Sequence, residues 1–155
     1  MEETKVIRFL TSKKDLLFGS QPFDQEIISR MLALSDENLP ILEHLPLRQT
    51  ATVKLISLIP LGFDCFYLGN VKRGFIKYFT FGGFGLLWLK DLSNAEERCR
   101  AYNRKKLLEV LKDPSVGIKM IEKSSKAKKA FRVAAQIAPE VIKGAKGVQN
   151  TMYIK

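Results

Sequence analysis

Two aspartates, Asp64 and Asp91, lie within or beside long apolar runs of this 155-residue chain. An unpaired carboxylate is costly in apolar surroundings, so each aspartate needs a cationic partner or a position near water. The same segment holds three candidate partners, Lys54, Lys77 and Lys90. We expect Asp64 and Lys77 to belong to one structural unit in which they face each other or a polar boundary.

Residues that could catalyse a reaction or bind a metal are few. His44 is the only histidine, and no nucleophile is paired with it. The two cysteines, Cys65 and Cys99, lie in different surroundings, and one histidine beside them is too little for a structural zinc site. The segment Gly82-Gly83-Phe84-Gly85 lacks the Gly-Lys-Ser/Thr that completes a phosphate loop. We expect a non-enzymatic protein without cofactor or metal, and with free thiols in a reducing compartment.

Two apolar runs surround the aspartates. The first covers residues 55–63 and continues over 65–68, and the second covers residues 74–89 with Lys77 as its only charge. Each approaches the roughly 20 residues that a helix needs to cross about 30 Å of hydrocarbon. Residues 78–89 are rich in glycine, which costs up to about 1 kcal/mol per residue in a soluble helix but permits close packing in a membrane. The runs favour two membrane spans over a soluble bundle with two buried helices.

A motif extends through both runs. It reads Gly62-Phe63-Asp64-Cys65-Phe66-Tyr67-Leu68-Gly69 and, after a spacer that contains Gly74, Thr80-Phe81-Gly82-Gly83-Phe84-Gly85-Leu86-Leu87-Trp88-Leu89-Lys90-Asp91. Over residues 51–92 this spacing resembles the two-transmembrane (TM-two) domain family. The resemblance implies an all-α fold built on an integral membrane hairpin of two spans. The residues that match the family pattern are Asp64, Phe66, Tyr67, Leu68, Gly69, Gly74, Thr80, Gly82, Gly83, Gly85, Trp88 and Asp91.

The sequence departs from the family pattern at Cys65, where the resemblance implies an arginine. We expect an ion pair made by that arginine to be missing from this chain, and a signalling role that depends on the acidic-Arg-Phe triplet does not carry over. Within the hairpin, Asp64 and Lys77 are expected to face each other or the lipid headgroups. Trp88 and Tyr67 suit the interface belt or simple packing.

The charge distribution divides the chain into three parts. Residues 1–50 carry more acidic than basic side chains and are expected to form a cytosolic helical region, with a helix that Asp24 caps and that extends to Ser35. Residues 51–92 form the predicted hairpin. Residues 93–155 hold fifteen basic and six acidic side chains, so most of the net charge of +10 lies there. We expect a basic helical tail whose first helix continues the second span and ends before Pro114.

The basic tail and the N-terminus predict the topology. The first residues lead to no apolar segment of a cleavable signal peptide, and the excess of basic residues after the second run places the C-terminus in the cytosol. A multi-pass membrane protein with both termini cytosolic follows. The basic side chains expected to contact anionic lipid headgroups are Arg98, Arg100, Arg104, Lys105, Lys106, Lys126, Lys128, Lys129 and Arg132.

Three functions are compatible with these features. The first is a membrane anchor or scaffold whose cytosolic flanks bind lipid headgroups and recruit a protein partner. The second is a soluble basic helical protein that binds nucleic acid, although only Phe131 and Tyr153 interleave with the basic tail residues. The third is a subunit of a channel or transporter formed by homo-oligomeric hairpins, although no row of polar residues lines one face. The sequence favours the first.

Overall fold

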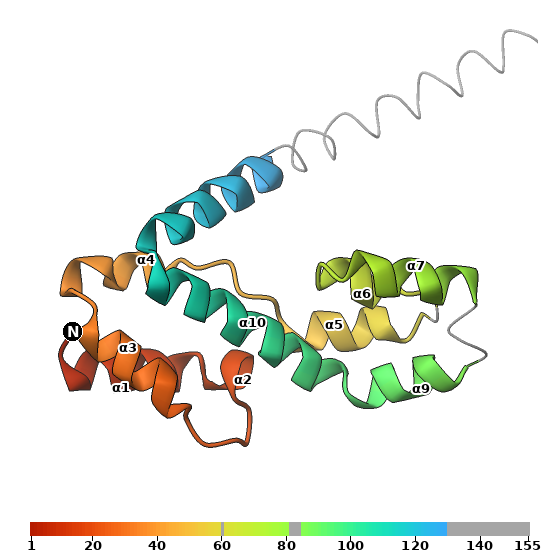
Figure 1. The fold of residues 1–155 in the computed structure, drawn as a ribbon, viewed down its shortest axis with the longest axis horizontal. Helices are drawn as coiled ribbons and strands as arrows, with labels where there is room; N and C mark the ends of the chain where they lie inside the picture. The colour runs from red at the N-terminus through yellow and green to blue at the C-terminus, as the bar shows by residue number, and fades with distance from the viewer. Residues whose placement is uncertain (60, 81–84, 130–155) are drawn as a thin grey trace, which may run out of the picture.

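The fold is all-α, as the sequence predicts. A computed structural model describes residues 1–59, 61–80 and 85–129, and these residues form helices and no strands. The helices are α1 (Glu3–Ser12), α2 (Lys14–Leu17), α3 (Gln25–Ala33), a 3-10 turn (Asp36–Asn38), α4 (Leu39–Glu43), α5 (Thr50–Ser57), α6 (Phe63–Tyr67), α7 (Val71–Phe79), α9 (Leu86–Ser93) and α10 (Ala95–Lys112), followed by helical residues 114–129. Figure 1 shows α1–α4 at one end of α10 and α5, α6, α7 and α9 at the other.

Helix α3 confirms the predicted N-terminal helix and its cap. The side chain of Asp24 accepts a hydrogen bond from the backbone N–H of Glu26 at 2.9 Å. Ile27 and Met31, four residues apart, lie on one face of the helix and are fully buried. The helix ends at Ala33, two residues before the predicted end at Ser35.

Helix α10 is the element that joins the two ends of the molecule. Its buried residues pack with those of α1–α4 and the following loop in a single apolar core. The predicted first and third parts of the chain therefore fold together. The buried members of this core are Val6, Phe9, Leu10, Leu17, Phe18, Ile27, Met31, Leu42, Leu45, Leu107, Val110 and Leu111.

The predicted continuation of α9 into α10 is wrong. Helix α9 ends at Ser93, α10 begins at Ala95, and the two helices lie at an angle to each other (Figure 1). The side-chain amide of Asn94 donates to the carbonyl of Lys90 at 2.8 Å, beside the backbone N–H that bonds to the same oxygen. Such local side-chain bonds compete with helix continuation. The predicted end of α10 before Pro114 is confirmed.

The predicted hairpin of two long spans is not confirmed. None of the helices within residues 1–59, 61–80 and 85–129 combines the length and apolar character needed to cross a bilayer. The first apolar run is divided between α5 and α6, with Gly62 between them in the left-handed conformation at φ 79°. A Cβ at Gly62 would lie 2.7 Å from the carbonyl oxygen of Gly74, so this turn requires glycine to approach α7.

Candidate functional site

A buried ion cluster lies among the short helices of residues 50–93. Asp64 comes from α6, Lys77 from α7 and Asp91 from α9. Their side chains are 0%, 1% and 2% exposed, respectively. The ammonium of Lys77 lies 3.0 Å from Asp64 Oδ1 and 2.9 Å from Asp91 Oδ2, so it bridges the two carboxylates. The predicted pairing of Asp64 with Lys77 is thus present.

Two arginines complete the cluster. Arg98, in the first turns of α10, places Nη1 2.7 Å from Asp64 Oδ2 and 3.3 Å from Asp91 Oδ2. Arg73, on α7, places Nη2 2.6 Å from Asp91 Oδ1. Each carboxylate is therefore held by at least two cations. Because isolated buried charges cost several kcal/mol, this mutual pairing offsets the cost of burying the two aspartates and their cations.

The partners of the aspartates were only partly predicted. Lys77 was among the three expected lysines, whereas Lys54 pairs with Glu96 at 3.0 Å and Lys90 lies on the exposed side of α9. The arginines were missed. Spacing could have indicated Arg73, which precedes Lys77 by one helical turn, but not Arg98, which lies beyond the break at Asn94.

The departure at Cys65 has a structural counterpart. Cys65 is fully buried, and its Sγ lies 3.2 Å from Arg98 Nη2 and 3.6 Å from Asp64 Oδ2. The expected absence of an ion pair from an arginine at position 65 stays a prediction, and in this chain α10 places the guanidinium of Arg98 beside the Cys65 thiol instead. Both cysteines are free thiols in the structure.

The cluster has donor atoms of the kind that bind metals. One atom each from Asp64, Cys65 and Asp91 lies within 4.8 Å of the others. The same carboxylate oxygens, however, already accept hydrogen bonds and charge from Lys77 and Arg98. A metal ion would have to displace these cations, so the arrangement fits an internal ion network better than a metal centre.

Arg98 stays charged in this position. Burial lowers the pKa of its guanidinium, but the hydrogen bond to Asp64 and the charge of Asp91 outweigh burial and raise the pKa above its ordinary value. A permanent cation at the start of α10 therefore faces both aspartates across the boundary between the short helices and α10.

Apolar side chains cover the outside of the same helices. Among the described residues, ten of the thirteen large apolar side chains that are exposed lie between residues 49 and 93. Exposure reaches 75% at Phe79 and 67% at Leu55. We call these ten residues the apolar surface: Leu55, Leu58, Ile59, Phe63, Val71, Phe75, Ile76, Tyr78, Phe79 and Leu89. This distribution, with charged side chains inside and apolar side chains outside, is the reverse of that in a water-soluble domain.

The aromatic residues of the motif support the packing of the short helices. The rings of Phe66 and Phe75 meet edge to face with centroids 5.2 Å apart, and Gly74 leaves room for the Phe66 ring. Trp88 donates its indole N–H to the carbonyl of Ser57 at 2.8 Å, which ties α9 to α5. Tyr67 lies under the guanidinium of Arg48 at 4.2 Å.

The remaining motif residues are placed as follows. Leu68 is buried with Val53, Ala95 and Cys99 in a small second core. Gly69 and Gly85 both adopt positive φ, at 75° and 85°. Thr80 donates its hydroxyl to the carbonyl of Ile76 at 2.6 Å. Gly82 and Gly83 lie outside the described residues.

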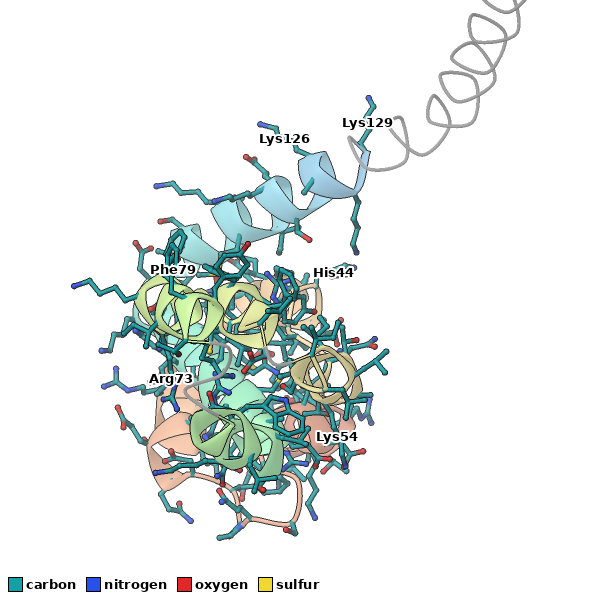
Figure 2. All side chains as sticks on the ribbon, turned by 90° about the vertical axis from the view of Figure 1, so that its right-hand side faces the viewer. His44, Lys54, Arg73, Phe79, Lys126 and Lys129 are labelled. Atoms are coloured by element: carbon teal, nitrogen blue, oxygen red, sulfur yellow. The ribbon has the colours of Figure 1, made fainter. Side chains whose placement is uncertain are left out.

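The predicted headgroup-binding residues divide into two groups. Arg98, Arg100 and Arg104 make internal contacts: Arg98 belongs to the ion cluster, Arg100 bonds to Glu96, and Arg104 bonds to Glu97 and to the carbonyl of Leu17. Lys106 is half-buried and donates to the Pro46 carbonyl. Lys105, Lys126, Lys128 and Lys129 are accessible, and Figure 2 shows Lys126 and Lys129 projecting from helical residues 114–129. Arg132 lies outside the described residues.

The comparison with known families matches the short helices. Residues 49–93 match the model of the TM2 domain, which confirms the resemblance seen in the sequence. The chain therefore contains a TM2 domain. Neither a curated protein nor a solved structure matches the chain. Four members of the ion cluster lie within the matched residues, and Arg98 lies outside them.

Proposed function

We propose that the TM2 domain anchors this protein in a membrane and that the flanking helices form a cytosolic platform for lipid headgroups and a protein partner. The observation that carries the proposal is the reversed distribution of polarity in residues 49–93. Side chains with full charges face one another in the interior, and the apolar surface faces outward. In lipid, ionisable groups face the interior of a helix bundle and apolar groups face the hydrocarbon.

The shared core of the flanks supports a topology with both termini on one side. The helices before the TM2 domain pack against α10, which follows it, so both flanks enter and leave the membrane at the same face. The excess of basic residues after residue 93 favours the cytosol as that side. Of the two basic residues at the start of α7, Arg73 is neutralised by Asp91, which leaves only Lys72 to oppose this orientation.

The proposed role is non-enzymatic. Asp64 and Asp91 are the strongest candidates for general bases in the domain, but each is held by at least two cations. In this network the oxygens of both carboxylates are engaged by cations. The network is better suited to fixing the relative positions of α6, α7, α9 and α10.

Extraction of membranes with alkaline carbonate tests the anchor. We expect the full chain to stay in the pellet, and release into the supernatant would favour a peripheral basic protein such as one that binds nucleic acid. A variant with Ile76→Glu and Phe79→Glu should be released, since both residues belong to the apolar surface. The matched control carries Ile7→Glu and Ile118→Glu, which alter similarly exposed residues outside the TM2 domain and should leave the protein in the pellet.

Protease treatment of sealed inverted vesicles tests the topology. The cytosolic face is outside in these vesicles, so protease should remove the basic helix 114–129. Protection of that helix from protease in intact vesicles, with cleavage after detergent is added, would contradict the proposed orientation. The same samples report on the N-terminal helices, which should be cut on the same side as the basic helix.

A further inference from the structure

A basic groove lies between α10 and the helical residues 114–129. It has a volume of about 420 Å³ and is open to solvent. The residues that matter for its chemistry are Arg48, Tyr102, Lys106, Met120, Lys123 and Ser124. Three of these side chains are cationic, and no acidic residue is among the described residues that line it. We call this feature the basic groove.

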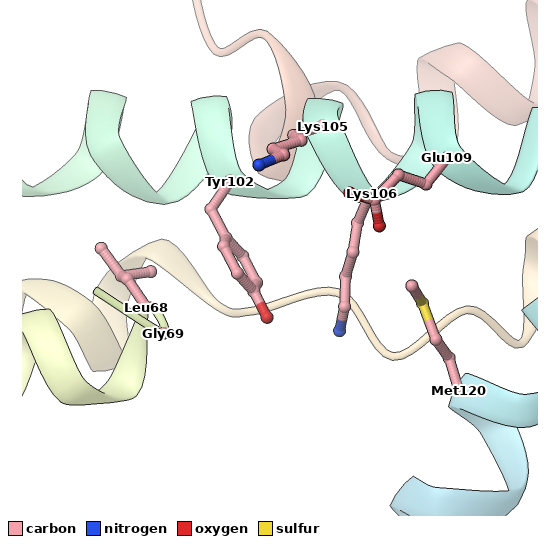
Figure 3. Close-up of a pocket in the computed structure, with 7 residues that line it drawn as sticks. All are labelled: Leu68, Gly69, Tyr102, Lys105, Lys106, Glu109 and Met120. Carbon is pink, nitrogen blue, oxygen red and sulfur yellow. The ribbon is translucent and has the colours of Figure 1, made fainter. Parts of the chain in front are cut away.

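A second pocket adjoins the basic groove and connects it to the TM2 domain. The two share Tyr102, Lys106 and Met120, and the second also includes Leu68 and Gly69 of the TM2 domain. Figure 3 shows Tyr102 and Lys106 extending from α10 toward Met120, on the side where the loop before α5 passes. The basic groove therefore lies at the boundary between the proposed anchor and the cytosolic helices.

Arg48 is held in the basic groove by its backbone. Its N–H donates to Asn103 Oδ1 at 2.8 Å, and Asn103 Nδ2 donates to the Arg48 carbonyl at 2.8 Å and to the Leu16 carbonyl at 2.9 Å. Cys99 Sγ adds a contact of 3.4 Å to the same Arg48 carbonyl. Because Asn103 is fully buried, these hydrogen bonds fix the backbone of Arg48 in place.

Two cations of the basic groove, Arg48 and Lys106, lie against aromatic rings and have hydrogen-bond donors without a partner among the described residues. The Arg48 guanidinium lies 4.2 Å from the centre of the Tyr67 ring, and its Nε is buried without a hydrogen-bond partner among the described residues. Lys106 Nζ lies 5.3 Å from the centre of the Tyr102 ring and donates to the Pro46 carbonyl at 3.1 Å. That single bond leaves two of its three donors available.

The width of the basic groove is set by how closely helical residues 114–129 approach α10. A Cβ at Gly117 would lie 2.5 Å from Ile41 Cγ2 and 2.8 Å from Val110 Cγ1, so only glycine lets helical residues 114–129 pack this near to α4 and α10. Three residues further along this helix, Met120 packs against the apolar core. Lys123 follows one turn later and lines the basic groove together with Arg48 and Lys106.

We propose that the basic groove binds a phosphate group, carried by an anionic phospholipid headgroup or by a soluble phosphate ester. One guanidinium and two ammonium groups line the basic groove with no acid among its described lining residues, and charge-assisted bonds from such donors are the strongest interactions available to a phosphate. The acidic Glu109 lies in the adjoining pocket, so the phosphate belongs beside Arg48 and Lys123. The lipid source rests on the proposed membrane anchor, whereas the phosphate site does not.

Binding to the full chain in a neutral detergent tests the proposal. The probes are short-chain phosphatidic acid, short-chain phosphatidylcholine and glycerol phosphate, measured by calorimetric titration. A variant with Arg48→Gln, Lys106→Gln and Lys123→Gln should weaken binding of phosphatidic acid about tenfold or more. The matched control with Arg8→Gln, Lys14→Gln and Lys112→Gln removes the same charge from exposed positions outside the basic groove and should stay within about twofold of the natural chain.

The outcomes distinguish a lipid headgroup from a soluble phosphate ester as the source of the phosphate. Binding of both phosphatidic acid and glycerol phosphate that depends on the basic groove assigns a soluble phosphate ester, and binding of phosphatidic acid alone assigns a lipid headgroup. Equal loss in both triple variants, or equal affinity for phosphatidylcholine, would overturn the proposal. Unfolding temperatures of both variants identify a loss of fold.

Carbonate extraction keeps this proposal distinct from the anchor. If the triple variant of the basic groove no longer binds phosphate but stays in the membrane pellet, the result supports both the phosphate site and the anchor. If carbonate releases the natural chain and that chain still binds phosphate, the proposed membrane anchor is wrong and the proposed phosphate site stands. A Gly117→Val variant, which forces the walls of the basic groove apart, should weaken phosphate binding without any change in charge.

Discussion

The two ends of α10 bury opposite kinds of side chain. At its C-terminal end, Leu107, Val110 and Leu111 pack with the N-terminal helices in an apolar core. At its N-terminal end, Arg98 enters a buried ion cluster whose surrounding helices expose their apolar side chains. One straight helix thus takes part in two regions whose polarity is reversed. The difference shows that this protein buries full charges as mutually paired groups, whereas the apolar core needs no such pairing.

The largest expected effect comes from the centre of the ion cluster. Lys77→Met leaves Asp64 and Asp91 buried with less cationic charge, and breaking a buried ion pair in this way costs about 3–5 kcal/mol. Unfolding of the detergent-solubilised chain measures the loss. Lys90→Met, on the exposed side of α9, serves as the control and should change stability little.

A double variant sharpens this result. Asp64→Ala should also destabilise the chain, and Asp64→Ala combined with Lys77→Met should lose much less than the sum of the two single losses. Additive losses would mean that the two side chains act independently, and the ion cluster would not be the unit described above.

The same substitution in the two regions tests the comparison directly. Leu107→Ala removes a fully buried side chain from the apolar core and should cost about 2–5 kcal/mol. Leu89→Ala removes one that is 57% exposed on the TM2 domain and should cost far less in detergent unfolding. Comparable losses at both positions would indicate that Leu89 is covered by protein, and the reversed distribution of polarity would fail.

Two glycines with the same backbone conformation provide a smaller effect. Gly69→Ala should cost about 1–2 kcal/mol, since φ is positive and the nearest atom, on Tyr102, is 4.0 Å from the added Cβ. Gly62→Ala has the same strain and in addition meets the Gly74 carbonyl oxygen at 2.7 Å, so it should cost clearly more. Thermal unfolding of the two variants compares them, and an equal loss would contradict the close contact between the Gly62 turn and α7.

The smallest effect is expected from an ion pair near the surface that links α5 to the first turn of α10. A hydrogen bond from Lys54 lowers the pKa of Glu96 below its ordinary value of 4.5. The stabilisation is therefore present above this value and is lost as pH falls through the lowered pKa. Because the side chains of Lys54 and Glu96 are 62% and 40% exposed, water screens the pair, and Glu96→Gln should cost less than about 1 kcal/mol at neutral pH. Unfolding measured from pH 7 to pH 3 should show the difference between natural chain and variant disappear.

The sequence predicted the parts of the fold that depend on local patterns. The cap of α3 at Asp24, the end of α10 before Pro114 and the all-α class follow from residue types at short spacing. The motif around Asp64 and Asp91 identified the TM2 domain. Pairing of Asp64 with Lys77 also followed, because a carboxylate in an apolar run needs a nearby cation.

The missed features depend on contacts between distant segments. Arg98 was assigned to lipid headgroups, since nothing in its neighbourhood along the chain distinguishes it from Arg100 or Arg104. The break at Asn94 turns α10 so that Arg98 reaches Asp64, 34 residues earlier. The backbone of Arg48 is held in place by a hydrogen bond to Asn103, 55 residues later. Pairings between residues so far apart in the sequence are set by tertiary packing, so local sequence patterns do not indicate them.

The position of Arg98 has a consequence for biosynthesis. The chain is made from its N-terminus, so Asp64, Lys77 and Asp91 all leave the ribosome before Arg98 does. A nascent chain that ends at residue 93 holds two carboxylates with Lys77 and Arg73 as their only cluster cations, and Cys65 has no guanidinium beside it. The TM2 domain of this protein therefore completes its charge network only when the first turns of α10 have been synthesised.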